Sequence, residues 1–199
     1  LAGGHSGADI HLSRGNANSL LARFLYGWYK RYPFNLVSFD GGDKHNVISR
    51  ESTAVITCDD FEALKEAAGA FRRQVQDELR AADAGLQIRL DAIGKRERVL
   101  SCRQTHRILT AALLAPAGLL GYDAQMNLVD ASSNLGVVRT DEQTVRLEYL
   151  MRFNTAGKYI EWMERYRAVS ELTGADMEQT GYYDCWERAQ DNKLEKIYK

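Results

Sequence analysis

The chain has 199 residues, and its 26 Lys and Arg nearly balance its 27 Asp and Glu, for a formal net charge of -1. Its 45% hydrophobic and 27% charged residues are ordinary globular values and argue against intrinsic disorder. The lack of a basic surplus argues against a dedicated nucleic-acid-binding protein. No apolar run reaches the roughly 20 residues that a membrane span needs. The three cysteines, Cys58, Cys102 and Cys185, are odd in number and far apart, which fits a reducing cytoplasm.

The first half of the chain predicts helices with apolar stripes and strands rich in β-branched residues. Asn16 or Asn18 is expected to cap the first helix, and Pro33 prevents that helix from continuing. The expected elements are, in chain order, a helix to about residue 31, strands over 35–40 and 52–58, a helix from Asp59 or Asp60 that ends at Gly85, and a half-buried strand over 86–91.

The second half repeats this plan. Its clearest strand covers 144–153, where apolar and polar residues alternate. The other expected elements are a helix over about 104–115, a strand over 131–139, a helix over about 156–173 ended by Gly174, and a last strand near 177–184. Each half therefore has two adjacent strands, a helix and a strand. This weak duplication predicts an α+β fold of two ferredoxin-like β-β-α-β halves, about 1–95 and 96–199, that form a mainly antiparallel sheet with helices on one face.

The N-terminal motif Gly4-His5-Ser6-Gly7-Ala8 is close to the Gly-x-Ser-x-Gly nucleophile elbow of serine hydrolases. That elbow needs a buried strand before it and a helix directly after it, and the sequence offers neither. The alternative is a tight turn made by the glycines. The nearest cluster of metal-binding residue types is His5, Asp9 and His11, but its spacing matches no zinc motif, so we expect no metal ligands in this chain.

Two further residues are candidates for substrate binding. Asn46 follows the turn at Gly41-Gly42, and Arg152 lies on the polar side of the strand over 144–153. Arginine suits two-pronged recognition of a carboxylate. The alternative for Arg152 is a solvated or ion-paired strand residue.

Four motifs resemble those of one enzyme family, in the same order along nearly the whole chain. They are Leu-Ala-Gly-Gly-His-Ser-Gly-Ala-Asp-Ile-His at 1–11 with Arg-Gly-Asn-Ala-Asn at 14–18, the segment 38–51, Ala-Ser-Ser-Asn-Leu-Gly-Val-Val at 131–138, and Leu-Met-Arg at 150–152. They closely resemble the lid, or dimerisation, domain of the aminoacyl-histidine dipeptidases (Xaa-His dipeptidases, peptidase D) of the dizinc exopeptidase superfamily. One departure is Ser49, where that family usually has proline.

The resemblance implies that residues 1–199 are a lid domain excised from a longer cytoplasmic metallopeptidase. In that family the lid is inserted between two halves of the catalytic domain, so two zinc ions and the general base would lie outside this chain. His5 would stabilise the oxyanion, while Asn46 and Arg152 would hold the terminal carboxylate of an Xaa-His-type dipeptide. The implied partners are this dipeptide and the chain's own catalytic domain, with a homodimer left open and with neither nucleic acid nor membrane.

Two other interpretations remain open. The first is a stand-alone ferredoxin-like module that binds or regulates through a ligand, and the second is a fragment of a serine hydrolase. Under the lid interpretation the isolated chain is a peptidase part without hydrolase activity of its own.

Overall fold

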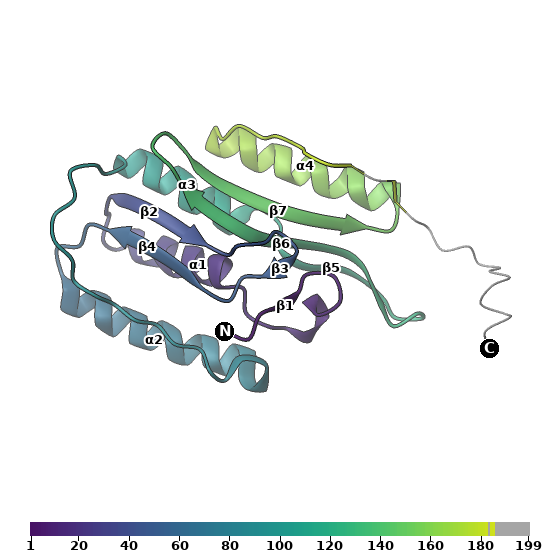
Figure 1. The fold of residues 1–199 in the computed structure, drawn as a ribbon, viewed down its shortest axis with the longest axis horizontal. Coiled ribbons are helices and arrows are strands. Elements are labelled where there is room, and N and C mark those ends of the chain that lie inside the picture. The colour runs from purple at the N-terminus through teal and green to yellow at the C-terminus, as the bar shows by residue number, and fades with distance from the viewer. Residues whose placement is uncertain (183, 186–199) are drawn as a thin grey trace, which may run out of the picture.

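The computed structural model describes residues 1–182, 184 and 185. Helices and strands are mixed along the chain, in the order shown in Figure 1. The helices are α1 (Ala17–Tyr29), α2 (Phe61–Leu79), α3 (Cys102–Leu114) and α4 (Ala156–Thr173), with short 3-10 turns η1 (Ile10–Leu12) and η2 (Arg80–Asp83). The strands are β1 (Gly4–His5), β2 (Leu36–Gly41), β3 (Val47–Ile48), β4 (Ser52–Ile56), β5 (Gly118–Asp123), β6 (Leu128–Thr140) and β7 (Val145–Phe153).

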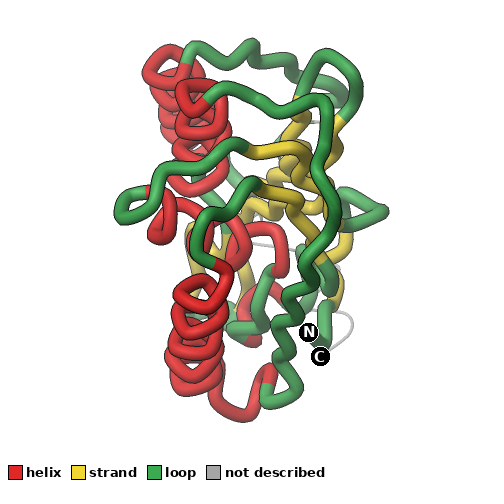
Figure 2. The backbone as a smooth tube through the Cα atoms, turned by 90° about the vertical axis from the view of Figure 1, so that its left-hand side faces the viewer, coloured by secondary structure: helices red, strands yellow, loops and turns green. Residues whose placement is uncertain are grey.

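Five strands form an antiparallel sheet, and the long strand β6 is its centre. Along one edge β6 pairs with β7, from Ala131 opposite Phe153 to Thr140 opposite Val145. Along the other edge β5 pairs with the start of β6, while β2 meets it where Gly41 lies opposite Val138 and continues to β4. The helices lie mainly on one side of the strands (Figure 2). This confirms the expected α+β class with a mainly antiparallel sheet.

Local sequence signals set the helix ends. The side chains of Asn16, Asp60 and Thr155 each accept a backbone N–H from the first turn of α1, α2 and α4. Ser101 and Gln104 form a reciprocal capping box at the start of α3. Gly174 ends α4 in the left-handed conformation, at φ 61°.

The apolar core lies between the helices and the sheet. Fully buried side chains include Phe39 and Leu36 of β2, Leu109 of α3, and Leu135 and Val138 of β6. A second cluster joins Phe24 and Trp28 of α1 to Leu64 of α2. Among the described residues, no helix combines the length and the apolar content needed to span a membrane.

Several expectations at the ends of the two halves are wrong. Helix α2 ends at Leu79, not at Gly85, because Arg80 turns to a positive φ of 48° and a 3-10 turn follows. Residues 86–91 pair with no strand in the described structure, although Leu86 is buried and Gln87 exposed as the alternation predicts. The described part of 177–184 is also irregular, and Tyr183 lies outside the described residues. Neither half therefore has its closing strand, and β5 was not expected.

Candidate functional site

The His5 loop (residues 3–14) lies beside the turn that carries Asn46. Strand β1 pairs with β3, so that His5 lies opposite Val47. The backbone N–H of Ser6 donates to the carbonyl oxygen of Asn46 over 3.0 Å. Two regions that are forty residues apart in the sequence therefore meet at one place.

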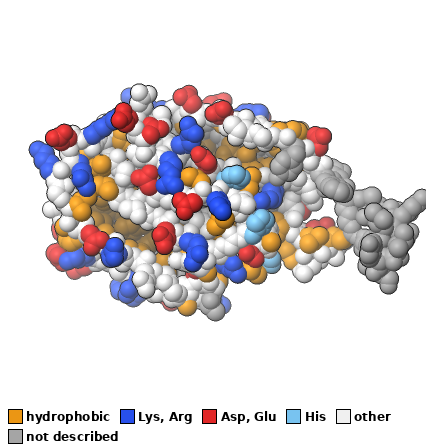
Figure 3. All heavy atoms as spheres, in the orientation of Figure 1, with side chains coloured by type: hydrophobic (Ala, Val, Ile, Leu, Met, Phe, Trp, Pro, Cys, Tyr) orange, Lys and Arg blue, Asp and Glu red, His pale blue; other side chains and the backbone are white. Residues whose placement is uncertain are grey.

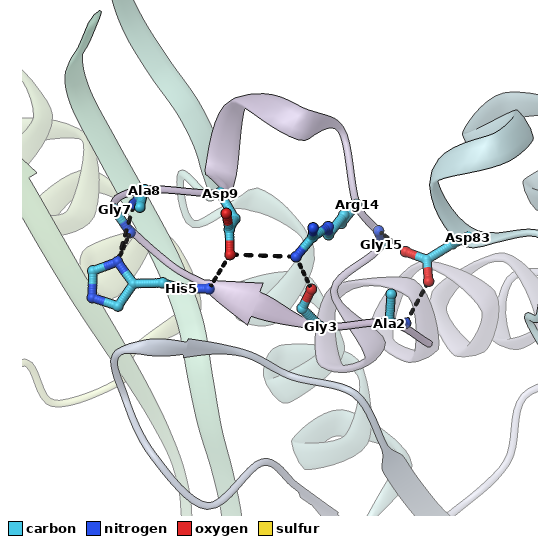
Figure 4. A network of polar contacts seen from close by, with 9 residues as sticks. All are labelled: Ala2, Gly3, His5, Gly7, Ala8, Asp9, Arg14, Gly15 and Asp83. Atoms are coloured by element: carbon cyan, nitrogen blue, oxygen red, sulfur yellow. Dashed lines mark hydrogen bonds and ion pairs between the residues drawn. The ribbon is translucent and has the colours of Figure 1, made fainter.

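The His5 imidazole has a defined tautomer. Its Nδ1 accepts hydrogen bonds from the backbone N–H groups of Gly7, at 3.2 Å, and Ala8, at 3.0 Å (Figure 4). A ring nitrogen that accepts carries no proton, so the hydrogen-bond pattern assigns the proton to Nε2. His5 is exposed. The loop thus presents the imidazole with its Nε2–H available as a donor.

Ser6 joins the His5 loop to strand β7. Its side chain is fully buried, and its Oγ accepts a hydrogen bond of 2.7 Å from the Arg152 guanidinium. Ser132 of β6 donates to the Ser6 carbonyl oxygen over 3.4 Å. The approach is close, because a Cβ on Gly7 would lie 3.2 Å from Nε of Arg152. Since Ser6 is buried on a guanidinium and His5 Nδ1 is occupied by backbone groups, this geometry does not support a serine nucleophile.

The positive charge of Arg152 is not neutralised by a carboxylate among the described residues. It is partly buried, and in the described part of the chain no Asp or Glu oxygen lies within the 4.0 Å of an ion pair with it. The guanidinium has five N–H donors, and one nitrogen is engaged by Ser6. A partly buried cation without a neutralising carboxylate is suited to an anionic ligand.

The turn around Asn46 is fixed to the centre of the sheet. The Asn134 side chain of β6 donates to the carbonyl oxygens of His45, at 2.9 Å, and Val47, at 2.8 Å. Gly136 allows this contact, because a Cβ there would lie 2.5 Å from the His45 Cα. Asn46 itself is partly buried. Both backbone neighbours of Asn46 are therefore held on β6.

Ser49 keeps this turn in shape where the resembled family has proline. Its side chain is buried, and its Oγ donates to the Glu51 carbonyl oxygen over 2.9 Å. Its own carbonyl oxygen accepts the Ala17 N–H at the start of α1. The serine thus connects the turn to the first helix.

The structure brings all three predicted site residues, His5, Asn46 and Arg152, into contact with Ser6 or its immediate neighbour. Sequence reasoning missed Ser6 and Asn134 as site-building residues, although both stand inside the motifs that carried the resemblance. The polar network of Figure 4, which includes Asp9, Arg14 and Asp83, was missed as well.

The described residues do not form a metal site. No group of three or more His, Cys, Asp or Glu side chains in this part of the chain could hold a metal ion. Asp9, the central member of the cluster at 5–11, is engaged instead by the His5 N–H and by Arg14. The donor set therefore does not fit a bound metal ion.

Comparisons with known proteins agree with this fold. Residues 1–83 match the family model of the peptidase dimerisation domain of the M20 peptidases. The cytosol non-specific dipeptidase of Escherichia coli (strain K12) is 30% identical over 192 residues, which cover 94% of this chain. The crystal structure of aminoacylhistidine dipeptidase from Vibrio alginolyticus superposes with a TM-score of 0.93 at 29% identity and covers 100% of this chain. Nearly the whole chain is thus similar to these dipeptidases.

The relation covers part of each of those proteins. The chain spans 39% of the length of the Escherichia coli dipeptidase and 41% of the Vibrio alginolyticus enzyme. The resemblance to the dimerisation domain of this peptidase family is confirmed. Residues 1–83 thus match a peptidase dimerisation domain, and the chain as a whole is similar to part of two dipeptidases.

Proposed function

We propose that this chain is the substrate-clamping lid of a metal-dependent dipeptidase. The observation that carries the proposal is the link through Ser6, which joins the His5 loop, the Asn46 turn and Arg152 of β7. This arrangement places an imidazole N–H donor and an unneutralised guanidinium beside Gly7, because a Cβ there would lie 3.2 Å from Arg152 Nε and 3.3 Å from His5 Cε1. A dipeptide needs both kinds of group, since it has a scissile carbonyl and a terminal carboxylate.

His5 is the proposed oxyanion donor. Peptide hydrolysis places negative charge on the carbonyl oxygen in the tetrahedral intermediate, and a pre-aimed donor stabilises that charge more than it stabilises the neutral substrate. The bonds from Gly7 and Ala8 hold the ring in the tautomer that donates from Nε2. The ring therefore needs no tautomer change before it acts.

Arg152 and Asn46 are the proposed carboxylate holders. The Arg152 guanidinium can donate two parallel N–H groups to a carboxylate, and Ser6 fixes its orientation. The Asn46 amide can add a further donor, and its turn is held on β6 through Asn134. A carboxylate clamp selects substrates with a free C-terminus close to the scissile bond, as in a dipeptide.

The metals and the general base are proposed to belong to segments of the enzyme outside this chain. We propose two zinc ions there, which would activate the attacking water. The role of this chain is then to bind the dipeptide's carboxylate and the oxyanion and to exclude bulk water when the lid closes. Cytoplasmic location, assembly as a homodimer and a preference for Xaa-His dipeptides are further parts of this proposal.

The carboxylate role is tested by Arg152→Met in the full-length enzyme, with one dipeptide and the corresponding dipeptide amide as substrates. The variant should lower kcat/KM for the dipeptide by about 30-fold or more, since a desolvated charge pair is worth about 2–5 kcal/mol. The amide lacks the carboxylate and should lose little. Arg146→Met removes an exposed cation from the same strand and is the matched control. An equal loss for both substrates would assign Arg152 to folding or lid orientation instead.

The oxyanion role is tested by His5→Ala in the same enzyme. A donor that acts mainly on the intermediate should, when removed, lower kcat and kcat/KM together by about a hundredfold. His11→Ala changes an exposed histidine of the same loop and should change neither constant. Unchanged kcat in His5→Ala would rule out this role.

A further inference from the structure

One buried carboxylate closes the base of the His5 loop. Asp83 is 3% exposed, and its Oδ1 accepts the Ala2 N–H over 2.5 Å while its Oδ2 accepts the Gly15 N–H over 2.6 Å (Figure 4). Residues 2 and 15 directly flank the His5 loop. A single side chain from the 3-10 turn η2, distant in sequence, thus holds both ends of the segment that carries His5.

A second set of contacts crosses the inside of the loop. The Arg14 guanidinium donates to the Gly3 carbonyl oxygen over 2.7 Å and contacts the Asp9 carboxylate at 3.3 Å. The same Asp9 oxygen accepts the backbone N–H of His5 over 2.9 Å. Figure 4 shows these contacts as a band along the loop: Asp83 holds Ala2 and Gly15, their chain neighbours Gly3 and Arg14 contact each other, and Arg14 contacts Asp9, which accepts the His5 backbone N–H.

The backbone at the two ends of the His5 loop has little room to move. Gly3 has a positive φ of 71°, and a Cβ on Gly15 would lie 2.9 Å from the Leu79 side chain. Both Asp83 oxygens are committed to backbone N–H groups, and charge-assisted bonds of this kind are about twice as strong as neutral ones. If one of them were lost, a buried donor would be unpaired and the loop would shift.

We propose that Asp83 is a positioning residue for His5: by holding Ala2 and Gly15 together, it sets the direction in which the imidazole Nε2–H points. The proposal rests on the proposed function for its catalytic consequence, because the aim of the imidazole matters for catalysis only if His5 serves the oxyanion. The structural part of the proposal concerns the tautomer and the order of the His5 side chain, and it can be tested without measuring activity.

The first test is nuclear magnetic resonance of the 199-residue chain with Asp83→Asn. Asparagine keeps one acceptor oxygen but places an NH₂ group against the other backbone N–H, so one end of the loop is released. Long-range ¹⁵N–¹H spectra at about pH 8.5, where free imidazole is neutral, report the tautomer of His5. We expect the Nε2–H tautomer alone in the wild type and a mixture of both tautomers in the variant, with faster amide exchange across the loop.

Asp77→Asn is the matched control, because Asp77 is an exposed residue of α2 and the change removes the same charge. It should leave the His5 spectrum unchanged. An unchanged His5 tautomer and unchanged loop exchange in a folded Asp83→Asn variant would overturn the proposal.

A second variant keeps the proposal testable if Asp83→Asn does not fold. Arg14→Met removes the contacts to Gly3 and Asp9 while the Asp83 clamp stays in place. Arg14 is partly exposed, and the same mixture of His5 tautomers is expected. A single Nε2–H tautomer in this variant would contradict positioning through the band.

The second test uses the full-length enzyme and separates positioning from general stability. Asp83→Asn should lower kcat by about 10- to 100-fold with little change in KM, since small misplacement of a catalytic group has effects of this size. In a His5→Ala background the same change should cost no further activity. A full additional loss there would overturn the proposal. If His5→Ala alone leaves kcat unchanged, the proposed function fails while the spectra still decide the positioning of His5.

Discussion

The two halves of the molecule share an order of elements, but they differ in how the segment after the second helix packs. Each contains a helix (α1 or α3), then a hairpin of the sheet (β2–β4 or β6–β7), and then a second helix (α2 or α4). Strand β1 precedes α1, and strand β5 precedes the second hairpin. In the first half the segment 86–91 follows, and Ile88 and Leu90 pack against the core beside α1 and α2. In the second half the segment after α4 leaves a hollow of about 1200 Å³ lined by β7, α3, α4 and this segment.

The side chains show the same difference. Leu64 of α2 is 3% exposed, whereas Ile160 and Leu172 of α4 are 59% and 72% exposed. The surface view of Figure 3 shows charged groups spread widely over the described face, with His side chains among them. Ile160 and Leu172 therefore contribute less apolar burial than Leu64 does, although Met163 and Tyr166 of α4 are buried.

The second half contributes Arg152 and the polar strand β6, which holds the site segments of the first half. In the central strand β6, Ser132, Ser133 and Asn134 are all buried, where apolar residues would pack better. Ser132 and Asn134 are hydrogen-bonded to the site segments around Ser6 and His45, and Ser133 to Tyr166. The buried polar side chains of β6 therefore hold loops of the first half in place, at a cost in packing.

The largest expected difference between the halves is in their second helices. Leu64→Ala in α2 should lower the free energy of unfolding by about 2–5 kcal/mol, because it leaves a cavity in the core. Leu172→Ala in α4 should change it by less than about 0.5 kcal/mol. Denaturant unfolding of both variants measures the two values. A loss of several kcal/mol for Leu172→Ala would mean that the Leu172 side chain is buried, and the comparison would be wrong.

Local signals explain how much of this fold the sequence could predict. Helix α4 lies where it was expected, because Thr155 and Gly174 mark its ends chemically. The prediction of a strand over 86–91 was wrong because alternation indicates which side chains are buried. It does not indicate whether a partner strand is within reach. Strand β5 was missed because Pro116 and Gly118 mask it, and it depends on the long edge of β6.

The site was predictable where a residue stands in a motif and not where it depends on distant contacts. The roles of His5, Asn46 and Arg152 came from the resemblance, and these roles remain predictions. Ser6 meets Arg152 across 146 residues, and Asp83 meets Ala2 across 81. Spacing in a single sequence carries no signal for such pairs, because the fold alone decides which backbone donors a buried carboxylate reaches.

A second comparison concerns two buried tyrosine hydroxyls of the second half. The Tyr166 hydroxyl bonds Ser133 Oγ and the Pro116 carbonyl oxygen, whereas the buried Tyr149 hydroxyl has no partner in the described structure. Tyr166→Phe should cost about 1–3 kcal/mol of unfolding free energy, since it leaves those partners unpaired. Tyr149→Phe should be close to neutral. Equal losses in thermal or denaturant unfolding would show that Tyr149 also has a partner.

The same tyrosines predict a loss of stability in alkali. Burial raises the pKa of Tyr149 and of Tyr166 well above the ordinary value of about 10. The unfolded chain therefore ionises first, and stability that is fully present below pH 10 is lost as the pH rises above it. Each tyrosine contributes a slope of about 1.4 kcal/mol per pH unit. Unfolding from pH 9 to 11 should show a shallower decline in Tyr149→Phe than in the wild type, and parallel declines would contradict burial of this hydroxyl.

The smallest expected effect on stability belongs to an ion pair that joins α1 to α2 in the first half. The Arg23 guanidinium of α1 donates to both carboxylate oxygens of Glu78 of α2, at 2.7 and 2.6 Å, and this holds the pKa of Glu78 at about 2. Because the two side chains are 36% and 42% exposed, solvent screens the pair, and Glu78→Gln should cost only about 0.2–1 kcal/mol at pH 7. On α4 the Arg165–Glu161 pair lies within one helix, so Glu161→Gln should cost about 0.3–0.5 kcal/mol or less.

The pH dependence of this pair has a definite sign. A lowered pKa in the folded state means that the stabilisation is present above the unfolded pKa of about 4.5 and is lost as the pH falls towards 2. The difference in unfolding free energy between wild type and Glu78→Gln should therefore shrink from pH 6 to pH 2.5, and it should also shrink in 1 M salt, where the Debye length is about 3 Å. A difference that stays constant with pH and salt would mean that Glu78 acts through packing of its side chain between α1 and α2, since neither acid nor salt removes an apolar contact.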